Sequence, residues 1–528
     1  MSGVMARALL CETVTGRSMA ELIAARDAAQ GDMVELRLDG VSDLDVDAAL
    51  HGRRHPVVVT CRPEWEGGGF LGSEESRRAI LARALDLGAD FVDVEWATLH
   101  GSHAERFAAL VGRMRDRIVL SSHDFVAVPA DLDARVRDMR SSGTAVIKIA
   151  VTVGRLAETL PLRDVARHGD AVVIGMGDSG VASRLLATRY GSRWTYAGNG
   201  VAPGQIPAVR MVEEFRFRDV RPTTDVFGVV SATAMHSLSP VMHNAAFAAA
   251  GLDAVYVPLQ TADFADFIEF ASALPVAGAS VTIPFKRDAL QAAARVDDLT
   301  RDVGAANTLR RLGSSEGIAD DARAPGMEAG TGQPVDGGWE ATNTDVEGFL
   351  VPLERELGPL AGLRAAVVGA GGSARAVIVA LLARGARVTV HARRREQAED
   401  VTVSLGAELG PWPVPGGSWD VLVNCTPLGG PTLRHESPLP GGPFTGRLVY
   451  DLTYGPGDSA LLRDARQAGC ATLDGLPMLI AQAERQFEWW TGQKPAAGVM
   501  RAAAERRLAG VAAGAEAPAL RPDVERTL

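Results

Sequence analysis

Cysteine is scarce in this chain of 528 residues. The four cysteines, Cys11, Cys61, Cys425 and Cys470, lie far apart and form no Cys-x-x-Cys pair. This spacing excludes a disulfide framework and a zinc ribbon, and it is typical of a reducing compartment. The sequence shows no cluster of metal-ligating residues, so we expect no metal.

Two further absences narrow the class of protein. The sequence has no run of about 18 uncharged apolar residues, so we expect no membrane span. Its start lacks the long apolar core of a signal peptide, which with the cysteine pattern predicts a cytoplasmic protein. A net charge of -11 argues against nucleic acid and anionic membranes as partners. It does not exclude small anionic substrates, because a binding site is local.

The length allows several domains. An apolar content of 47% and a charged content of 23% are normal for globular folds. Three or four domains, or one barrel with two smaller units, would account for the size. After about Arg507 the chain is rich in Ala, Gly, Pro and Glu, and we expect this tail to fray.

A glycine-rich turn near the middle of the second half indicates a dinucleotide site. Gly369, Gly371 and Ala374 fit the pattern G-x-G-x-x-[GA]. The pattern lies between a predicted strand and a predicted helix, which is the order that a Rossmann unit needs. Gly369 permits the tight turn, Gly371 lets the backbone approach a pyrophosphate, and Ala374 lets the helix lie close to the strand. The alternative is a glycine-rich turn with no ligand. The predicted Rossmann unit consists of a strand at residues 365–368, a helix at 376–383 and a second strand at 386–390.

The end of the second strand indicates which nicotinamide cofactor binds. An NAD site usually has Asp or Glu there, whereas this chain has Arg393, Arg394 and Arg395. Guanidinium groups suit a 2′-phosphate, so NADP(H) is favoured over NAD. The alternative is a solvated helix start, but cations there oppose the helix dipole.

The first 218 residues alternate between short apolar strands and helices, which predicts a (β/α)₈ barrel. In that fold, functional side chains lie at the carboxyl ends of the strands. We expect helices at 18–29, 74–87 and 130–141 among others. The expected strands are Ala8–Cys11, Met33–Leu38, Pro56–Thr60, Phe91–Val94, Ile118–Ser121, Ala145–Ile149, Ala171–Ile174 and Trp194–Ala197.

Polar residues occur where the barrel would place a site. Glu35 and Arg37 are two apart and share one strand face. His123 follows the fifth strand, and Lys148 lies inside the apolar sixth strand. Burial disfavours the charged form of a lysine and leaves an amine that can attack a ketone, and a histidine one strand away could move protons. The alternatives are a strand-end lysine that reaches solvent and a structural histidine.

The segments VELRLD, TCRPEWEGG, SSHDF, IKIA and APGQIP occur in this order and resemble type I 3-dehydroquinate dehydratase over residues 5–218. The resemblance implies that Lys148 forms an imine with the substrate ketone, that His123 shuttles the proton and that Glu66 orients His123. Val201 departs from the family, which often has Ser there, and a hydroxyl contact is lost. The implied substrate-binding residues are Glu35, Arg37, Arg62, Arg184 and Gln205.

A polar segment at 219–225 is interpreted as a linker, after which a second series of strands and helices begins.

Ser237 and Ser239 flank a turn that opens a helix, and such hydroxyls can bind a carboxylate; alone they could be only an N-cap. Lys286, which follows a strand, and Asp345 could converge on one hydroxyl and transfer a proton beside a hydride. Each alone is more often structural.

The segments SLSP, HN, VTIPFK, AANT, NTD, VGAGGSARA and DGLPMLIAQA resemble shikimate dehydrogenase over residues 224–510. The resemblance implies that Lys286 and Asp345 are the catalytic pair, with Lys286 as the proton donor. Family members usually have NRT and a later basic residue where this chain has Ala392-Arg393-Arg394 and Gln397. The implied substrate-binding residues are Ser237, Ser239, Thr282, Asn307, Tyr454 and Gln482. The implied NADP-binding residues are Gly369, Ala370, Gly371, Gly372, Ser373, Ala374, Arg393, Arg394, Thr426 and Gly475.

Together these patterns predict an α/β protein. The expected parts are a TIM barrel (1–218), a linker (219–225), a substrate-binding domain (226–345, with an insertion at 311–340), a Rossmann NADP-binding domain (346–475), helices that return to the substrate domain (476–510) and a flexible tail (511–528). The predicted function is a bifunctional enzyme that dehydrates 3-dehydroquinate to 3-dehydroshikimate and reduces this ketone to shikimate with NADPH. The alternatives are a catabolic quinate or shikimate dehydrogenase fusion that uses NAD, and a non-catalytic metabolite sensor. The oligomeric state is left open.

Overall fold

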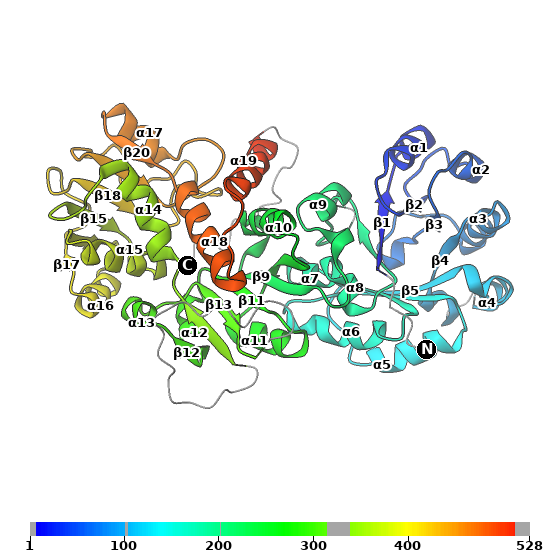
Figure 1. Ribbon diagram of the computed structural model, residues 1–528. Helices are drawn as coiled ribbons and strands as arrows, with labels where there is room; N and C mark the ends of the chain where they lie inside the picture. Colours follow the sequence, from blue (N-terminus) through cyan, green and yellow to red (C-terminus); the bar gives the residue numbers. More distant parts are fainter. Residues whose placement is uncertain (1–6, 101–103, 201, 314–337, 513–528) are drawn as a thin grey trace. The chain divides into compact units, whose positions relative to one another are not determined.

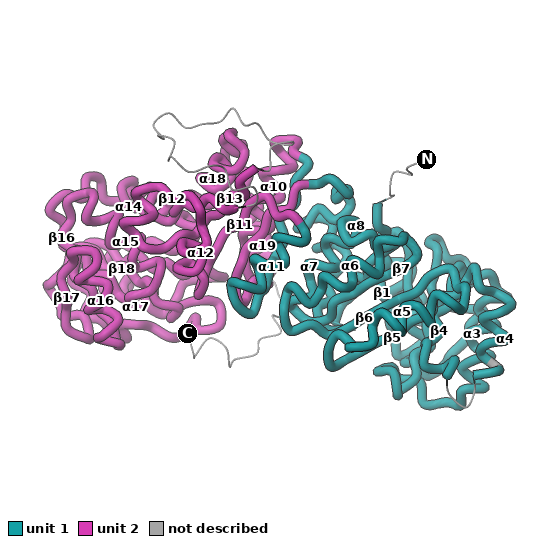
Figure 2. Tube along the Cα trace, turned by 90° about the horizontal axis from the view of Figure 1, so that it is seen from below, with its two compact units in different colours: residues 1–224, 253–274 teal, residues 225–252, 275–528 magenta. Residues whose placement is uncertain are grey.

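The computed structural model describes residues 7–100, 104–200, 202–313 and 338–512. Val201, most of the 311–340 insertion and residues 513–528 of the tail lie outside the described residues. The chain forms two compact units, one of residues 1–224 with 253–274 and one of residues 225–252 with 275–528 (Figure 2). Each unit is described by itself below.

The first unit contains the predicted barrel, part of which is labelled in Figure 1. All eight predicted strands are present in one parallel sheet. The sheet order is β7-β6-β5-β4-β3-β2-β1-β8, so β7 and β8 are its two ends. Arg193 N donates to Ala171 O at 2.9 Å across this seam, and the barrel is therefore nearly closed. The strands are β1 (Leu9–Val14), β2 (Met33–Arg37), β3 (Val57–Thr60), β4 (Phe91–Glu95), β5 (Ile118–Asp124), β6 (Val146–Thr152), β7 (Ala171–Met176) and β8 (Trp194–Ala197).

Alternating residues of these strands fill the barrel interior, because successive side chains of a strand point to opposite faces. Val146 and Ala150 of β6 belong to one buried cluster with Trp194 and Tyr196 of β8. Lys148 lies between Val146 and Ala150 and therefore also points inward. Strand β5 continues to Asp124, so His123 is the penultimate residue of the strand and does not follow it as predicted.

Helices cover the barrel, and side chains cap several of them. Ser18 accepts a hydrogen bond from Glu21 N and begins α1, and Ser73 does the same for α3 through Ser76 N. The α-helices are α1 (Met19–Ala28), α2 (Val46–Leu50), α3 (Glu74–Asp86), α4 (Ala104–Arg113), α5 (Leu132–Ser141), α6 (Leu160–Ala166), α7 (Val181–Leu185), α8 (Ala187–Tyr190) and α9 (Ala208–Glu213). Short 3₁₀ turns are η1 (Glu64–Glu66), η2 (Trp96–His100), η3 (Arg115–Arg117), η4 (Ala157–Thr159), η5 (Asp178–Gly180) and η6 (Phe217–Asp219).

The first unit also includes β10 (Ala254–Gln260) and α11 (Phe264–Ala273), which the sequence did not assign to it. Asp266 of α11 is fully buried and accepts hydrogen bonds from Leu156 N at 2.9 Å and from Ala157 N at 2.7 Å. The Thr261 hydroxyl donates to the same carboxylate at 2.7 Å. This carboxylate therefore fixes the loop that follows β6, the strand of Lys148.

The second unit begins with a mixed sheet in which β9, β11, β13, β14 and β12 are neighbours in that order. β9 pairs with β11 in parallel, whereas β13 is antiparallel to both β11 and β14. The elements are β9 (Asp225–Ser231), η7 (Ala234–His236), α10 (Ser239–Ala249), β11 (Gly278–Val281), α12 (Lys286–Ala292), β12 (Arg295–Val296), α13 (Asp298–Val303), β13 (Thr308–Arg311), β14 (Trp339–Thr342) and α14 (Asp345–Leu357).

A second sheet of this unit is parallel and has the order β17-β16-β15-β18-β19-β20. In chain order this is 3-2-1-4-5-6, the arrangement of a Rossmann fold. The predicted dinucleotide fold is confirmed, and its turn lies at the carboxyl end of the central strand β15. The elements are β15 (Arg364–Val368), α15 (Gly372–Ala383), β16 (Arg387–His391), α16 (Arg395–Leu405), β17 (Glu408–Leu409), β18 (Val421–Asn424), β19 (Leu448–Asp451), α17 (Ala460–Gln467) and β20 (Ala471–Leu473).

Two helices complete the unit, α18 (Leu476–Thr491) and α19 (Val499–Ala512). Gln486 of α18 accepts a hydrogen bond from the Ser280 hydroxyl at 2.8 Å, and Trp490 Nε1 donates to Leu309 O at 2.9 Å. The helix thus contacts the first sheet of the unit. α19 extends to Ala512, so the fraying expected after about Arg507 is wrong for the described residues.

Candidate active sites

Lys148 lies inside the barrel among charged and aromatic side chains. It is 5% exposed, and its Nζ lies 3.3 Å from Oδ2 of Asp93 and 3.5 Å from Oε1 of Glu35. The same atom lies 4.2 Å from the ring centroid of Tyr196. The Thr60 hydroxyl donates to Glu35 Oε1 at 2.8 Å. These contacts hold the amine inside the barrel, so the alternative of a lysine that reaches solvent is wrong.

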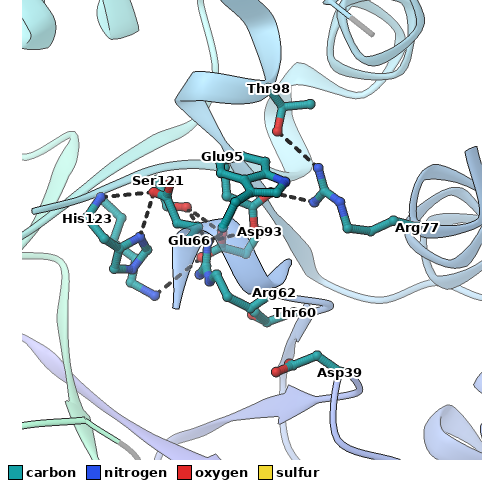
Figure 3. A network of polar contacts seen from close by, with 12 residues as sticks. Asp39, Thr60, Arg62, Glu66, Arg77, Asp93, Glu95, Thr98, Ser121 and His123 are labelled. Carbon is teal, nitrogen blue, oxygen red and sulfur yellow. Dashed lines mark hydrogen bonds and ion pairs between the residues drawn. The ribbon is translucent and has the colours of Figure 1, made fainter. Parts of the chain in front are cut away.

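Asp93 also belongs to a buried network of ions, which Figure 3 shows, and thus connects this network to Lys148. Arg62 Nη1 lies 2.9 Å from Oδ1 of Asp93 and 2.8 Å from Oε1 of Glu95. The Ser121 hydroxyl donates to Asp93 at 2.6 Å, and Arg77 pairs with Glu95. The guanidinium of Arg62, a predicted substrate-binding residue, is therefore occupied by two carboxylates.

Sequence reasoning missed both carboxylates of this network. Burial alone would raise the pKa of Asp93, but the charges of Arg62 and Lys148 hold that pKa below its usual range. Burial raises the pKa of Glu95 despite Arg62 and Arg77. The signal that could have revealed them was the spacing of Asp93 and Glu95, two apart in an otherwise apolar strand, as for Glu35 and Arg37.

His123 and Glu66 form a pair at the carboxyl end of the barrel strands. Nδ1 of His123 lies 3.1 Å from Oε1 of Glu66, and His123 N donates to the same oxygen at 3.1 Å. Burial, with the charges of Arg62 and Lys148, lowers the pKa of His123 well below its usual value. Burial raises the pKa of Glu66 to about 7, although Arg62 opposes this shift. His123 is thus a neutral imidazole, as a general base must be.

The other predicted residues of the barrel site have distinct surroundings. Arg37 makes two hydrogen bonds to Asp39, each of 2.8 Å. Arg184 is 1% exposed and donates only to backbone oxygens, Tyr196 O at 3.3 Å and Pro203 O at 3.1 Å, among the residues that the structure describes. Burial lowers the pKa of Arg184 to about 10. Gln205 Oε1 accepts from Ala202 N at 3.0 Å.

In the second unit, Lys286 and Asp345 meet as predicted. Nζ of Lys286 lies 2.6 Å from Oδ2 of Asp345, and both side chains are buried. Asn307 Nδ2 donates to the other oxygen of Asp345 at 2.8 Å. Asp345 is the first residue of α14, where the helix dipole favours a negative charge. Lys286 is the first residue of α12, where the dipole opposes a cation, and the carboxylate offsets this cost.

Among the predicted substrate-binding residues of this unit, Asn307 contacts Asp345 and also lies near Gln482. Gln482 Oε1 lies 3.5 Å from Asn307 Nδ2. Ser237 Oγ accepts a hydrogen bond from Ser239 N at 3.1 Å, so the two serines share one turn. Thr282 N donates to Val230 O at 3.1 Å, which fixes Thr282 beside the end of β9. The phenol of the half-buried Tyr454 accepts a hydrogen bond from the Leu238 backbone, between these serines, and desolvation raises the pKa of this phenol.

The glycine-rich turn has the shape that a dinucleotide needs. Gly369 has φ of 110°, and a Cβ there would lie 3.2 Å from a side-chain carbon of Thr426. A Cβ at Gly371 would meet nothing within 4 Å, so the space beside this residue is open. Gly371 N-caps α15 without a side-chain cap, which leaves the helix N-terminus available to a phosphate. Ala374 is fully buried against the fold, and Ala370, Gly372 and Ser373 complete the turn.

Other predicted cofactor residues lie at the same edge of this sheet. Gly369 N donates to His391 O at 2.9 Å, which places the end of β16 beside the turn. Arg393 and Arg394 follow this strand and are exposed. Thr426 donates to Asn424 in the loop after β18, with an oxygen-to-oxygen distance of 2.7 Å. Gly475 is the N-cap of α18, and a Cβ there would lie 2.1 Å from Leu452 O, so its role in the structure is close packing.

Lysine is rare in this chain, which has only Lys148, Lys286 and Lys494. The first two are 5% and 7% exposed, whereas Lys494, between α18 and α19, is exposed. Among the described residues, no group of three or more His, Cys, Asp or Glu side chains is arranged to hold a metal ion. Within the same residues, no helix combines the length and the apolar character that a membrane span requires.

These features define a two-part enzyme, a barrel with a buried lysine in its interior and a dehydrogenase with a Rossmann domain. Family models agree with this class. Residues 10–222 match type I 3-dehydroquinase, residues 229–309 match the shikimate dehydrogenase substrate binding domain, and residues 475–505 match the shikimate 5′-dehydrogenase C-terminal domain.

Some relatives match most of the chain, and others match one part of it. The chloroplastic bifunctional 3-dehydroquinate dehydratase/shikimate dehydrogenase of Arabidopsis thaliana is 30% identical over 521 residues, which cover 92% of this chain and 82% of that protein. The shikimate dehydrogenase (NADP(+)) of Halobacterium salinarum is 37% identical over 290 residues, 54% of this chain and 100% of that protein. The shikimate 5-dehydrogenase structure of Thermus thermophilus, in complex with NADP(H) and shikimate, is 32% identical and covers 54% of this chain and 100% of its own, with a TM-score of 0.45. This chain belongs to the family of bifunctional 3-dehydroquinate dehydratase/shikimate dehydrogenases.

Proposed function

We propose that the chain catalyses two successive reactions, the dehydration of 3-dehydroquinate in the barrel and the reduction of 3-dehydroshikimate to shikimate by NADPH in the second unit. One observation carries the proposal: two of the three lysines are buried, and each lies beside at least one carboxylate within its own unit. Buried lysines with specific polar partners are unusual unless they act in binding or catalysis.

In the barrel, Lys148 is the nucleophile. Its ammonium first gives a proton to solvent, and the amine then adds to the ketone carbon of 3-dehydroquinate. Loss of water, with uptake of one proton, gives the protonated imine. The protonated imine withdraws electrons from the adjacent carbon, and His123 takes a proton from that carbon. The carbon–oxygen bond of the neighbouring hydroxyl then breaks, and His123 returns its proton so that water leaves. Hydrolysis of the imine releases 3-dehydroshikimate and restores Lys148.

Substrate recognition in the barrel follows from charge. Arg184 is a buried cation without a carboxylate partner among the described residues, and such a charge is costly unless an anion joins it. We assign the substrate carboxylate to Arg184. The Arg62 guanidinium already has Asp93 and Glu95 as partners, so we assign it to holding these carboxylates in place beside the substrate.

In the second unit, Lys286 donates the proton that converts the ketone oxygen to a hydroxyl. Asp345 holds the ammonium at 2.6 Å, and Asn307 fixes Asp345 from the other side. Ser237 and Ser239 lie in one turn, and two neighbouring hydroxyls can donate to a carboxylate, so we place the substrate carboxylate there. Thr282, Asn307 and Gln482 are assigned to ring hydroxyls, and Tyr454 lines the site.

The residues of the glycine-rich turn fit a dinucleotide. The open space beside Gly371 and the uncapped start of α15 suit a pyrophosphate, and Arg393 is an exposed guanidinium at the end of the neighbouring strand. When bound, NADPH supplies the hydride for ketone reduction. The end of β16 carries arginines where an NAD site would carry a carboxylate, so no observation favours the NAD-dependent alternative. A reducing location such as the cytoplasm is part of the proposal, and four free thiols support it.

The test follows conjugated-enone absorbance in purified protein with 3-dehydroquinate. Enone should accumulate without NADPH and disappear when NADPH is added. Borohydride reduction during turnover should attach the substrate skeleton to Lys148, and because the chain has only three lysines, Lys286 and Lys494 serve as internal controls for peptide mapping. Absence of both enone and label would refute the barrel assignment, and 3-dehydroshikimate supplied directly would still test the second unit.

A further inference from the structure

Lys286, one residue of the proposed catalytic pair of the dehydrogenase, also contacts the helix that begins at the glycine-rich turn. Besides Asp345, the ammonium of Lys286 contacts Oγ of Ser373 at 3.2 Å. Ser373 is the second residue of α15, in the glycine-rich turn. Lys286 belongs to the first sheet region of the unit and Ser373 to the Rossmann part, so this hydrogen bond joins the two halves of the site.

Packing supports the same contact. A Cβ at Gly372 would lie 3.1 Å from Cδ of Lys286 and 3.5 Å from its Cβ. The aliphatic stem of the lysine therefore lies against the start of α15, and only glycine leaves room for it there without a shift. The stem and the ammonium thus both contact this first turn, at Gly372 and Ser373 respectively.

The geometry limits where the amine can point. A lysine ammonium has three donors, and two of them are directed at Asp345 and Ser373. The third direction is then fixed and is left for the substrate oxygen. A hydroxyl both accepts and donates, so Ser373 can accept from the ammonium before proton transfer and donate to the neutral amine afterwards. A carboxylate can accept a hydrogen bond from the ammonium, but it cannot donate one to the neutral amine.

We propose that Ser373 is a positioning residue for ketone reduction, whose hydroxyl orients Lys286 from the cofactor-binding helix. This inference rests on the proposed role of Lys286 as proton donor. It assigns to Ser373 a function beyond contact with the cofactor, because the hydroxyl acts on the lysine. The proton passes from Lys286 to the substrate oxygen, and the Ser373 proton stays on its own oxygen throughout.

The test compares Ser373→Ala with Ser373→Thr in the full-length protein. Ser373→Ala should lower kcat for 3-dehydroshikimate reduction about ten-fold, the scale of one hydrogen bond to a charged group, with KM for NADPH within about two-fold of the parent. The solvent deuterium isotope effect on kcat should rise, because proton transfer becomes slower. Ser373→Thr, which keeps the hydroxyl, should restore most of kcat. The matched control is Ser404→Ala, whose hydroxyl donates to Val401 O in α16 and should change nothing.

Two results would overturn the inference. A higher KM for NADPH with unchanged kcat in Ser373→Ala would make Ser373 a cofactor contact only. An unchanged isotope effect with lower thermal stability would make its role structural. Lys286→Met separates the inference from the function on which it rests: if that variant still reduces the ketone at the parental rate, the proposed role of Lys286 is wrong, whatever Ser373 does.

Discussion

One oxygen of Glu66 accepts hydrogen bonds from both the ring and the backbone of His123, each at 3.1 Å. The two bonds hold the imidazole in one orientation, and they are strongest when Glu66 is ionised, because hydrogen bonds to a carboxylate are stronger than those to a neutral acid. Burial raises the pKa of Glu66 to about 7. The orientation of the base therefore depends on a group that titrates near neutral pH.

This pair predicts the acid limb of the dehydratase. The pKa of Glu66 is raised, so the carboxylate is lost as pH falls through about 7, and kcat should fall with it. Glu66→Gln should lower kcat at pH 8 by about ten-fold or more, a part of the 10²–10⁴ that a positioned acid–base residue supplies, and should remove the limb near pH 7. The check is a pH–rate profile of both proteins with 3-dehydroquinate. A limb of unchanged position in Glu66→Gln would contradict the assignment.

The preference for NADPH over NADH should depend more on Arg393 than on Arg395. Arg393→Ala should raise KM for NADPH about ten-fold or more and leave KM for NADH unchanged, because a charge-assisted hydrogen bond to the 2′-phosphate is lost. Arg395 Nε already donates to Glu399 at 2.7 Å, so Arg395→Ala is the matched control and should have a smaller effect. Steady-state kinetics with both cofactors measure this. Equal losses for NADPH and NADH in Arg393→Ala would show that it does not recognise the phosphate.

The buried carboxylate of Asp266 should contribute to the stability of the first unit. Asp266→Asn replaces one acceptor oxygen by a donor, which leaves a backbone N–H of Leu156 or Ala157 without its partner. The free energy of unfolding should fall by about 1–3 kcal/mol. The control variant is Asp263→Asn. Asp263 is the N-cap of the same helix, and Asn caps a helix as well as Asp does, so this variant should keep the stability of the parent. Urea unfolding of both variants gives the comparison, and equal stabilities would contradict the prediction.

Acid should destabilise the second unit through His243. This histidine is fully buried, its Nε2 lies 3.3 Å from Oε1 of Gln486, and burial lowers its pKa to about 3. An unfolded histidine takes a proton near pH 6.5, so between pH 6.5 and 3 the unfolded state binds more protons and stability falls as pH falls. From this group alone the loss at pH 5 is about 2 kcal/mol.

The prediction for His243 is checked by comparing how much stability the parent and a variant without this histidine each lose between two pH values. Other groups titrate in the same range, so the parent and His243→Gln are compared in denaturant unfolding at pH 7.5 and pH 5. The variant should be less stable than the parent at pH 7.5 but should lose less stability between the two values. The same loss in both proteins would mean that His243 does not carry this part of the pH dependence.

Much of the fold was predictable because buried parallel strands are continuous apolar runs. Lys148 was found for the same reason, since one charge inside such a run is conspicuous. The Rossmann unit followed from the position of Gly369 and Gly371 between a strand and a helix. In these cases residues that are close together in the sequence are enough to predict the strand, the buried lysine or the turn.

What could not be predicted depends on distant partners. Asp93 and Glu95 alternate with valines and read as one polar face of a strand, whereas their partner Arg62 is about 30 residues away and faces the same interior. Asp266 belongs to a helix that the sequence assigned to the dehydrogenase, and its backbone partners are 109 and 110 residues away. Periodicity cannot reveal such contacts, because it records which face is polar and not what that face meets.

The scarcity of lysine has a practical consequence for chemical modification. Besides the α-amino group, an amine-directed reagent meets one exposed primary amine, at Lys494, since the side chains of Lys148 and Lys286 are buried. A dye, a biotin group or a solid support could therefore be coupled at a single known position near the end of α18. Arginine provides nearly all the positive charge of the surface, so such coupling would leave the charge pattern of the molecule almost unchanged.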